Sequence, residues 1–295
     1  MAHLLELLQK TEREGVAFGA NAPTIFPLGV APRRCAPTKA SGANAPPNAW
    51  LALGNKAVPL HAERKKLYDM KVIAHIRTDF KSKFGIPRQS GLVEGLRGTI
   101  VFTPEYRDAE ALRGLEDYSH IWLLWDFSLA HRDGGWSPTV RPPRLGGNRR
   151  MGVWATRSPF RPNNIGLSSV RITDIRLHTP QGPVIEVEGA DLMDGTPIYD
   201  IKPYLTFTDC HPEARSGFAG DLREKERPLE VEMPKCADAM LTPLQKKALT
   251  GVLAADPRPQ YQCDAERVYA MEFAGYEVKF TVDGEKARVV ALAKI

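Results

Sequence analysis

The chain has 295 residues, a net charge of +5 and an isoelectric point of about 9.0. This length allows one or two domains with a sizeable core, and the basic charge favours an anionic partner. Four widely spaced cysteines and seven scattered histidines argue against a zinc site or a disulfide framework, so we expect no metal. The apolar run at 121–125 ends at Asp126 and is too short for a membrane span, so we expect no membrane partner.

Residues 1–66 differ in composition from the rest of the chain. No acidic residue occurs between Gly15 and His61, and the pentapeptide GANAP appears twice. Such a segment has little apolar surface to bury, so we expect a low-complexity, disordered extension. We expect a cytoplasmic protein. Organellar targeting by the extension stays open, although three early glutamates, Glu6, Glu12 and Glu14, argue against it.

Residues 67–212 are expected to form the core, and their apolar pattern is that of β-strands. Apolar residues alternate at 72–76, 170–177 and 184–187, and the segment 120–127 is apolar on both faces, as in a central strand. No helix of about ten residues separates these strands, which argues against a doubly wound sheet. The sequence therefore predicts a mainly β fold, a closed or nearly closed antiparallel β-barrel.

Two further segments follow the core. Residues 213–239 are polar and rich in charge, which predicts a linker. Residues 240–295 are expected to form a small α+β module. In this module Thr242 to Gln245 has the pattern of a capping box with proline at the first helical position, and Asp283-Gly284 is typical of a hairpin turn.

The basic charge is concentrated in one window of the sequence. No acidic residue occurs from Gly134 to Thr173, whereas arginine is frequent there and lysine is absent. Within this window Arg157 and Arg161 flank Ser158-Pro159, and Pro162 follows, so proline fixes a stiff and irregular loop. Guanidinium groups on such a loop suit phosphates and bases, although a solvated basic face is the alternative.

Five stretches of the chain match the motifs of a known family in the same order. They are RTDFKSKFGIPRQSGL (77–92), GGWSPTVRPPRLGGNRRMG (134–152), GVWATRSPFRPNNIGLSS (152–169), DLMDGTPIYDIKPYL (191–205) and DPRPQY (256–261). They resemble the TrmO family of S-adenosylmethionine-dependent tRNA methyltransferases, and the resemblance covers about residues 68 to 295.

The resemblance implies a β-barrel methyltransferase that uses S-adenosyl-L-methionine and pairs as a homodimer. It implies methylation of N6 of N6-threonylcarbamoyladenosine at position 37 of a tRNA, next to the anticodon. Residues that it places at the cofactor are Arg88, Gln89, Ser90, Ser128, Leu129, Arg157, Leu167, Asp191, Leu192, Asp194, Gly195 and Thr196. Ser128 and Leu129 depart from the residues common in the family, and the turn at 191–195 taken alone also fits an ordinary tight turn.

The acceptor nitrogen implied by the resemblance belongs to a urea-like group and is a poor nucleophile, so a base or a polarising donor is expected. We expect Arg157, Asp200 and Tyr204 to be catalytic, with a structural role at a strand end as the alternative for the last two. The side chains expected to bind RNA are Arg141, Arg144, Arg149, Arg150, Arg161, Asn163, Lys202, Arg258 and Tyr261, with Trp136 and Trp154 available for stacking.

Two other functions stay open on the sequence alone. The chain could be an RNA-binding module that senses S-adenosylmethionine without methylating anything. It could also be a methyltransferase that acts on another RNA or on a small molecule. The long acid-free window argues against a small substrate but does not choose among RNAs.

Overall fold

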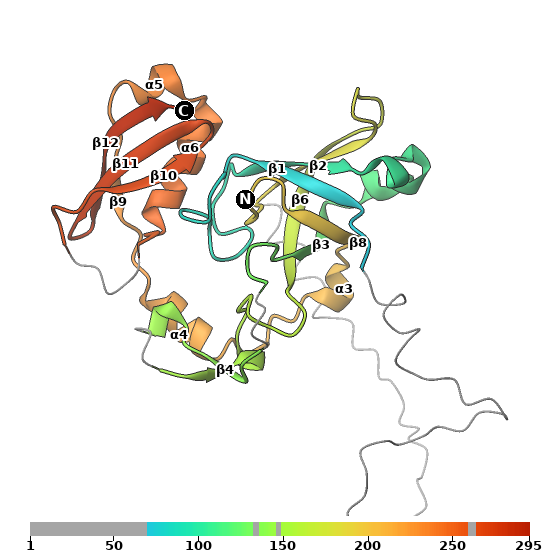
Figure 1. The fold of residues 1–295 in the computed structure, drawn as a ribbon, viewed down its shortest axis with the longest axis horizontal. Coiled ribbons are helices and arrows are strands. Elements are labelled where there is room, and N and C mark those ends of the chain that lie inside the picture. Colours follow the sequence, from blue (N-terminus) through green and yellow to red (C-terminus); the bar gives the residue numbers. More distant parts are fainter. Residues whose placement is uncertain (1–69, 132–135, 146–148, 259–263) are drawn as a thin grey trace, which may run out of the picture. The chain divides into compact units, whose positions relative to one another are not determined.

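The structure is a computed structural model that describes residues 70–131, 136–145, 149–258 and 264–295 (Figure 1). The expectations of disorder and of targeting for residues 1–66 lie outside these ranges. No helix within them is long and apolar enough to cross a membrane.

The first part of the described chain is a closed barrel of antiparallel strands, which confirms the expected fold class (Figure 1). Around the barrel the order is β1-β2-β7-β6-β3-β8, and neighbouring strands run antiparallel. The strands are β1 (Ala74–Thr78), β2 (Arg97–Phe102), β3 (His120–Asp126), β6 (Ile165–Arg176), β7 (Val184–Glu188) and β8 (Pro197–Pro203). Closure leaves the barrel without an open edge, so backbone groups along it are paired.

Alternate side chains of these strands fill the barrel interior. Ile76, Ile100, Ile121, Leu123 and Ile185 are completely buried in this cluster. Full burial of an aliphatic side chain of this size stabilises the fold by about 1.5–3 kcal/mol. The apolar segment 120–127 corresponds to β3, which pairs with β6 on one side and with β8 on the other, as expected of a central strand.

Short elements connect the strands of the barrel. Three 3-10 turns join β2 to β3: η1 (Pro104–Tyr106), η2 (Ala109–Leu112) and η3 (Leu115–Asp117). Between β3 and β6 lie a small hairpin of β4 (Thr139–Val140) and β5 (Met151–Gly152) and the turns η4 (Pro143–Leu145) and η5 (Val153–Ala155). The arginine-rich window of the sequence therefore falls on this connection and on most of β6.

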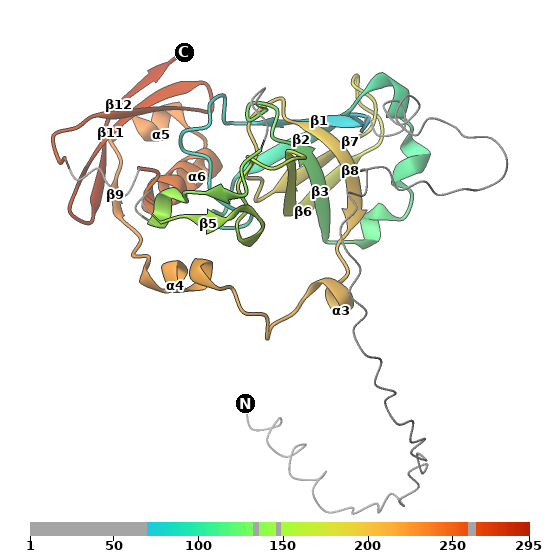
Figure 2. The ribbon, with the colours of Figure 1, turned by 60° about the horizontal axis from the view of Figure 1, so that its bottom comes forward.

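The last part of the chain is a four-stranded sheet with the order β10-β11-β12-β9, covered by a helix (Figures 1 and 2). Its elements, with the short helices that precede them, are α3 (Thr206–Asp209), α4 (Phe218–Lys225), β9 (Glu230–Glu232), α5 (Ala237–Met240), α6 (Pro243–Ala254), β10 (Tyr269–Phe273), β11 (Tyr276–Asp283) and β12 (Lys286–Lys294). The capping box at Thr242 and Gln245 is formed, and the Asp283-Gly284 turn joins β11 to β12. The segment expected as a linker contains α4, β9 and α5, and β9 pairs in parallel with β12.

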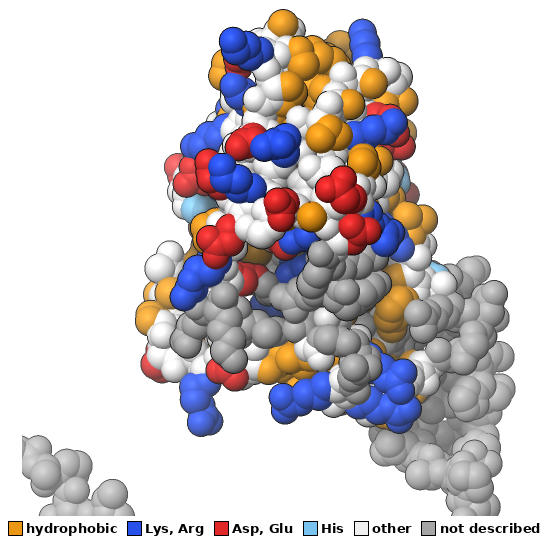
Figure 3. All heavy atoms as spheres, turned by 90° about the vertical axis from the view of Figure 1, so that its left-hand side faces the viewer, with side chains coloured by type: hydrophobic (Ala, Val, Ile, Leu, Met, Phe, Trp, Pro, Cys, Tyr) orange, Lys and Arg blue, Asp and Glu red, His pale blue; other side chains and the backbone are white. Residues whose placement is uncertain are grey.

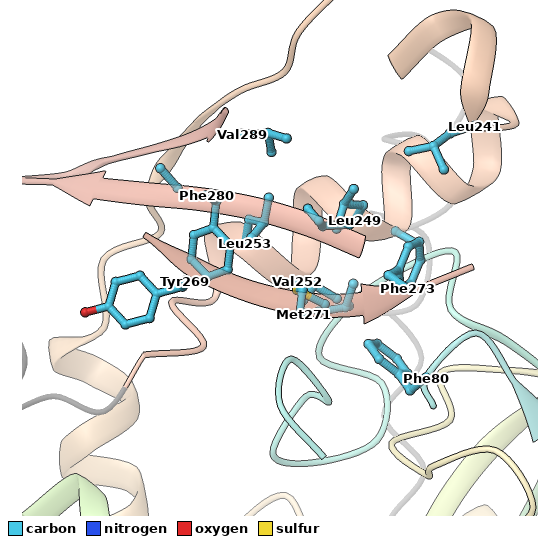
Figure 4. Close-up of a cluster of buried hydrophobic side chains, with 14 of the residues drawn as sticks. Phe80, Leu241, Leu249, Val252, Leu253, Tyr269, Met271, Phe273, Phe280 and Val289 are labelled. Atoms are coloured by element: carbon cyan, nitrogen blue, oxygen red, sulfur yellow. The ribbon is translucent and has the colours of Figure 1, made fainter. Parts of the chain in front are cut away.

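The loop between β1 and β2 packs against this C-terminal sheet. Phe80 and Phe273 meet edge to face with ring centroids 5.4 Å apart, and the Ala274 N–H donates to the Asp79 carbonyl at 2.9 Å. Figure 4 shows Phe80 beside Phe273 and Met271, at the border of the cluster that α6 and the sheet form. The loop that carries Arg88 and Gln89 is thereby anchored on the C-terminal sheet. A module of this size has a small core of its own, and the residues from the loop enlarge it.

Candidate functional site

Two hollows of the surface meet at the stiff loop between β5 and β6. The first, which we call the small pocket, measures about 480 Å³ and is bordered by residues of the β1–β2 loop, the end of β3, the start of β6 and the turn before β8. The second, the wide cleft, measures about 2130 Å³ and is bordered by the β4–β5 hairpin, the same stiff loop and the residues just before and within α4. The two hollows share Arg88, Gln89, Ala130, Thr156, Arg157, Ser158, Pro159 and Arg161.

The small pocket combines apolar walls with a few charged groups. Apolar side chains from the end of β3, the residue after it and the start of β6 border the pocket: Trp125, Phe127, Ile165 and Leu167. A volume of a few hundred Å³, apolar walls and a small number of polar groups are typical of sites for cofactor-sized ligands. The arrangement follows from the barrel, because β3 and β6 are hydrogen-bonded neighbours and pair Trp125 with Gly166 in register.

One carboxylate of the small pocket is held by a chain of buried hydrogen bonds. The Trp125 indole Nε1 donates to Ser168 Oγ at 3.0 Å, and Ser168 Oγ donates to Asp191 Oδ1 at 2.6 Å. Burial raises the pKa of Asp191, whereas the Ser168 hydroxyl, the Ser90 N–H and the positive charge of Arg157 lower it. The carboxylate is therefore oriented by donors but poorly hydrated, which suits a fixed contact to a cationic group of a ligand.

A second carboxylate, Asp126 at the end of β3, also lines the small pocket. His131 Nε2 lies 2.8 Å from Asp126 Oδ1, and the Tyr199 hydroxyl donates to the same side chain. Burial and the negative charge of Asp126 raise the pKa of Tyr199. A bulge between Leu124 and Trp125 brings Tyr199 of β8 to this place, because the register there passes from Asp200 to Ile198.

Arg157 stands where the two hollows join. Its guanidinium donates to Gln89 Oε1, so the stiff loop and the β1–β2 loop are connected by a side-chain hydrogen bond. Arg157 borders both hollows, and its charge acts on the buried Asp191. A planar guanidinium in this position can direct its donors toward a ligand from either side.

The wide cleft is basic and aromatic. Arg88, Arg141, Arg150, Arg157, Arg161 and Arg215 line it, and none of its described lining residues is acidic. Trp136 and Trp154 lie on it with ring centroids 5.5 Å apart. Stacking faces beside several arginines are typical of surfaces that bind single-stranded nucleic acid.

The structure brings together eight of the residues expected at the cofactor. Those that border the small pocket are Arg88, Gln89, Ser128, Leu129, Arg157, Leu167, Asp191 and Thr196. Ser90 reaches it through its N–H, which donates to Asp191. Leu192, Asp194 and Gly195 are not among the described lining residues. Leu192 is buried in the barrel core, Asp194 accepts from Lys81 Nζ at 2.6 Å and from the Thr78 N–H, and Gly195 has a positive φ in the turn.

The residues expected to bind RNA divide into four groups. Arg141, Arg150 and Arg161 line the wide cleft, whereas Arg149 and Asn163 are exposed and outside its described lining. Lys202 pairs with Asp200 at 2.8 Å, and Arg258, whose side chain is 12% exposed, is held by both carboxylate oxygens of Asp256. The Arg144 side chain and Tyr261 lie outside the described parts of the chain.

Asp200 and Tyr204, expected as catalytic residues, are not among the described residues that line either hollow. Asp200 is paired with Lys202, and Tyr204 packs on the indole of Trp122 with ring centroids 5.5 Å apart. Sequence reasoning missed Trp125, Asp126 and Ser168. Ser168 lies inside a recognised motif, but nothing in the sequence indicates that β6 directs it at Asp191.

Among the described residues, no three histidine, cysteine, aspartate or glutamate side chains gather as metal ligands would. The charged groups among the described lining of the two hollows are carboxylates, guanidiniums and the amine of Lys83, whose Nζ donates to the Leu129 carbonyl at 3.1 Å.

Comparisons with known proteins agree on one family. The model of the tRNA-methyltransferase O N-terminal domain matches residues 75–210, and that of the TrmO C-terminal domain matches residues 226–295. The tRNA (adenine(37)-N6)-methyltransferase of Escherichia coli K12 is 40% identical over 233 residues, covering 76% of this chain and 97% of that protein. A protein of Pseudomonas aeruginosa, provisionally named as an S-adenosylmethionine-dependent methyltransferase, is 40% identical over 202 residues, 66% of this chain and 84% of the relative.

A solved structure gives the same result for the fold. A crystal structure of TrmO from Pseudomonas aeruginosa superposes with a TM-score of 0.60 at 31% identity, covering 77% of this chain and 98% of that one.

Proposed function

Because the chain belongs to the tRNA-methyltransferase O family, we propose that it transfers a methyl group from S-adenosylmethionine to N6 of the adenosine at position 37 of tRNA. We further propose that this adenosine already carries a threonylcarbamoyl group on N6. The relatives' names support the first statement, and the second rests on the resemblance of the motifs alone.

The observation that carries the proposal is the wall that the two hollows share. A cofactor-sized pocket and a basic, aromatic cleft meet at residues 156–159 and 161. A nucleotide in the wide cleft can therefore present one atom to a methyl donor in the small pocket without either ligand leaving its site. Holding two reactants in this way lowers the entropic part of the barrier, by up to roughly 7–11 kcal/mol in favourable systems.

The residues of the small pocket fit S-adenosylmethionine. Its apolar walls suit the adenine ring, Asp126 and Asp191 suit the cationic sulfonium and ammonium groups, and the guanidiniums of Arg88 and Arg157 suit the carboxylate. When bound, this cofactor supplies an electrophilic methyl group on a positively charged sulfur.

The chain's own groups have separate tasks in this proposal. Arg157 orients the acceptor or the donor from the junction of the two hollows. Asp126 and Asp191 are the two acidic residues among the described lining of the small pocket. One of them contacts the cationic groups of the cofactor, and a carboxylate oxygen of the other takes the proton that leaves the acceptor nitrogen. Asp200 and Tyr204 stay as the alternative pair for this role.

We propose that two chains pair as a homodimer. The support is the exposure of apolar side chains at the small pocket, where Leu129 and Leu167 are 59% and 49% exposed. A second chain that covered them would exclude water from the reacting groups. Light scattering on the purified full chain measures the state directly. A monomer with full activity would contradict this part of the proposal.

The function is tested by incubating the full chain with methyl-labelled S-adenosylmethionine and tRNA with or without the threonylcarbamoyl group. Mass spectrometry of the digested nucleosides should show one added methyl group on the threonylcarbamoylated adenosine only. Methylation of the unmodified adenosine alone would contradict the proposal that the substrate adenosine already carries a threonylcarbamoyl group. Donor binding without methylation of any RNA would instead support a sensing module.

The identity of the proton acceptor is tested separately by Asp126→Asn, Asp191→Asn and Asp200→Asn. Loss of a positioned base lowers turnover by about a hundredfold or more. We expect this loss for Asp191→Asn or Asp126→Asn and not for Asp200→Asn. The opposite pattern would return the role to Asp200.

A further inference from the structure

Two exposed indoles lie side by side on the wide cleft. Trp154 is 63% exposed and Trp136 is 51% exposed, and their ring planes are tilted by 31°. Leaving two of the largest apolar side chains in water forgoes the burial that normally stabilises a fold. At the bottom of the coloured spheres in Figure 3, lysine and arginine side chains flank an apolar patch, at the height of the β4–β5 hairpin and α4 in Figure 1.

A fixed cation supports one of these indoles. The Arg161 guanidinium lies 4.9 Å from the ring centroid of Trp154. Arg161 Nη1 also donates to the Val153 carbonyl at 3.0 Å and to the Thr156 carbonyl at 2.8 Å. Arg161 is therefore committed to the loop and to Trp154, and we assign it a supporting role rather than the direct RNA contact expected from the sequence.

The segment that leads into α4 provides a second border of the same cleft. Arg215 and Phe218, which no motif or family comparison singles out, line it together with the two tryptophans. Both Figure 1 and Figure 2 show α4 beside the β4–β5 hairpin, although the two elements are far apart in the sequence. The cleft thus has an aromatic and basic residue on each of two separate chain segments.

We propose that the wide cleft is a clamp for one unpaired RNA base, stacked on the Trp136–Trp154 pair and confined by Arg215 and Phe218. The proposal rests on the proposed function for its ligand, an RNA loop. Because the cleft shares Arg157 and its neighbours with the small pocket, the clamped base is a neighbour of the adenosine that is methylated. Arginines without described acidic neighbours in the cleft favour a phosphate-linked base over the side chain of a protein partner.

The aromatic side of the clamp is tested by intrinsic fluorescence of the full chain, titrated with a synthetic RNA hairpin that has the loop of an anticodon arm. We expect quenching on binding. Trp154→Ala should weaken hairpin binding by about tenfold or more, whereas Trp154→Phe should retain most of it, because a ring still stacks. Tyr118→Ala, which removes an exposed ring outside both hollows, is the control and should bind normally.

A second RNA separates stacking from charge. A blunt duplex with the same stem and no loop offers no unpaired base, so Trp154→Ala should bind it as well as the unmodified chain does. Normal hairpin binding by Trp154→Ala, or an equal loss for the hairpin and the duplex, would overturn the clamp. Circular dichroism of each variant confirms that the exposed substitution leaves the fold intact.

The linker side is tested by Phe218→Ala and Arg215→Ala. If the base lies between the two borders, the effects of Phe218→Ala and Trp154→Ala on hairpin binding should be coupled rather than additive. A plot of the logarithm of the hairpin binding constant against the logarithm of the salt concentration has a slope that counts phosphate contacts. Arg215→Ala should reduce the size of this slope by about 0.7 if Arg215 contacts one phosphate. If the effects of Phe218→Ala and Trp154→Ala on hairpin binding are strictly additive and Arg215→Ala leaves the salt slope unchanged, Arg215 and Phe218 are not part of the clamp.

Failure of the clamp and failure of the proposed function give different results. If the unmodified chain methylates tRNA and Trp154→Ala has an unchanged KM for tRNA, the clamp alone is wrong. If hairpin quenching depends on Trp154 but no RNA is methylated, the clamp stands and the enzymatic function is wrong.

Discussion

The hydrogen bond from Ser168 to Asp191, which lines the small pocket, joins strand β6 to the turn before β8 at a distance of 2.6 Å. Ser168 is itself bonded by Trp125 and is only 1% exposed, so its hydroxyl has no freedom to turn toward solvent. The carboxylate is thereby oriented by the barrel before any ligand arrives. Preorganisation of this kind avoids a reorganisation cost at the moment of reaction.

The first prediction concerns the stability of Asp191→Asn at different pH values. Burial raises the pKa of Asp191 in the folded chain, so the folded state holds its proton at a pH where the unfolded chain has lost it. This contribution to stability is present in acid and is lost as the pH rises through the folded-state pKa. Relative to Asp191→Asn, the unmodified chain should therefore lose free energy of unfolding as the pH rises from the ordinary aspartate pKa of about 4 through the raised folded-state pKa.

Urea denaturation of both chains at several pH values measures this difference. A gap between the two unfolding free energies that stays constant over the whole range would show that Asp191 titrates as it does in the unfolded chain.

The second prediction is that Gly166→Ala damages the small pocket. Gly166 pairs with Trp125 across β6 and β3, and a methyl group at this position would overlap the Trp125 ring. The ring must then move away from Ser168, and overpacking of this kind costs about 1–3 kcal/mol. We expect lower stability in denaturation and weaker binding of S-adenosylmethionine in calorimetry.

Gly152→Ala is the matched control for this substitution. A methyl group at Gly152 would meet no atom of the described residues within 4 Å, and the φ of −58° at Gly152 suits any residue. Equal effects of the two substitutions would mean that overlap with Trp125 is not the cause.

Asp191 and Gly166 show which features of the site the sequence could predict and which it could not. The strand pattern is local, so alternation in segments such as 72–76 and 184–187 was enough to predict antiparallel strands and a barrel. Motif order placed Leu167 and Asp191 near the cofactor. The need for glycine at position 166 could not be predicted, because it depends on the register between β6 and β3, a strand about 40 residues earlier in the chain.

Other site features depend on irregularities that have no local signal. Asp126 acquires its hydrogen bond from Tyr199 through a bulge in the β3–β8 pairing, which no alternation pattern reveals. Arg258 was expected to bind RNA because of its motif, yet its guanidinium is engaged by Asp256 two residues earlier. The packing of Phe80 against Phe273 joins segments nearly two hundred residues apart, so the sequence pattern could not predict it either.

The third prediction concerns Glu188, which ties the β1–β2 loop to the barrel. The Gly95 N–H donates to Glu188 Oε1 at 2.7 Å, and Arg171 pairs with the same carboxylate. The Gly95 hydrogen bond and the Arg171 charge hold the pKa of Glu188 below its usual value. Its contribution to stability is therefore present at neutral pH and is lost as the pH falls through the lowered pKa.

Glu188→Gln should accordingly reduce the free energy of unfolding by about 1–2 kcal/mol at neutral pH, and the deficit should shrink in acid. Glu277→Gln is the control, because Glu277 forms an exposed pair with Lys279 and should change stability by less than about 1 kcal/mol. A deficit for Glu188→Gln that grows as the pH falls would contradict the direction of the pKa shift.

The last prediction concerns Arg157, at the junction of the small pocket and the wide cleft. Arg157→Lys keeps the charge but loses the planar fork of donors, one of which reaches Gln89 Oε1. If Arg157 orients a reactant, turnover should fall by about tenfold or more, equivalent to roughly 1.4 kcal/mol of barrier, while tRNA affinity changes little. Arg149→Lys, outside the described lining of both hollows, should leave turnover near normal. If Arg157 only adds positive field, the lysine variant should turn over normally, and a neutral Arg157→Gln should change only the affinity for tRNA and its salt slope.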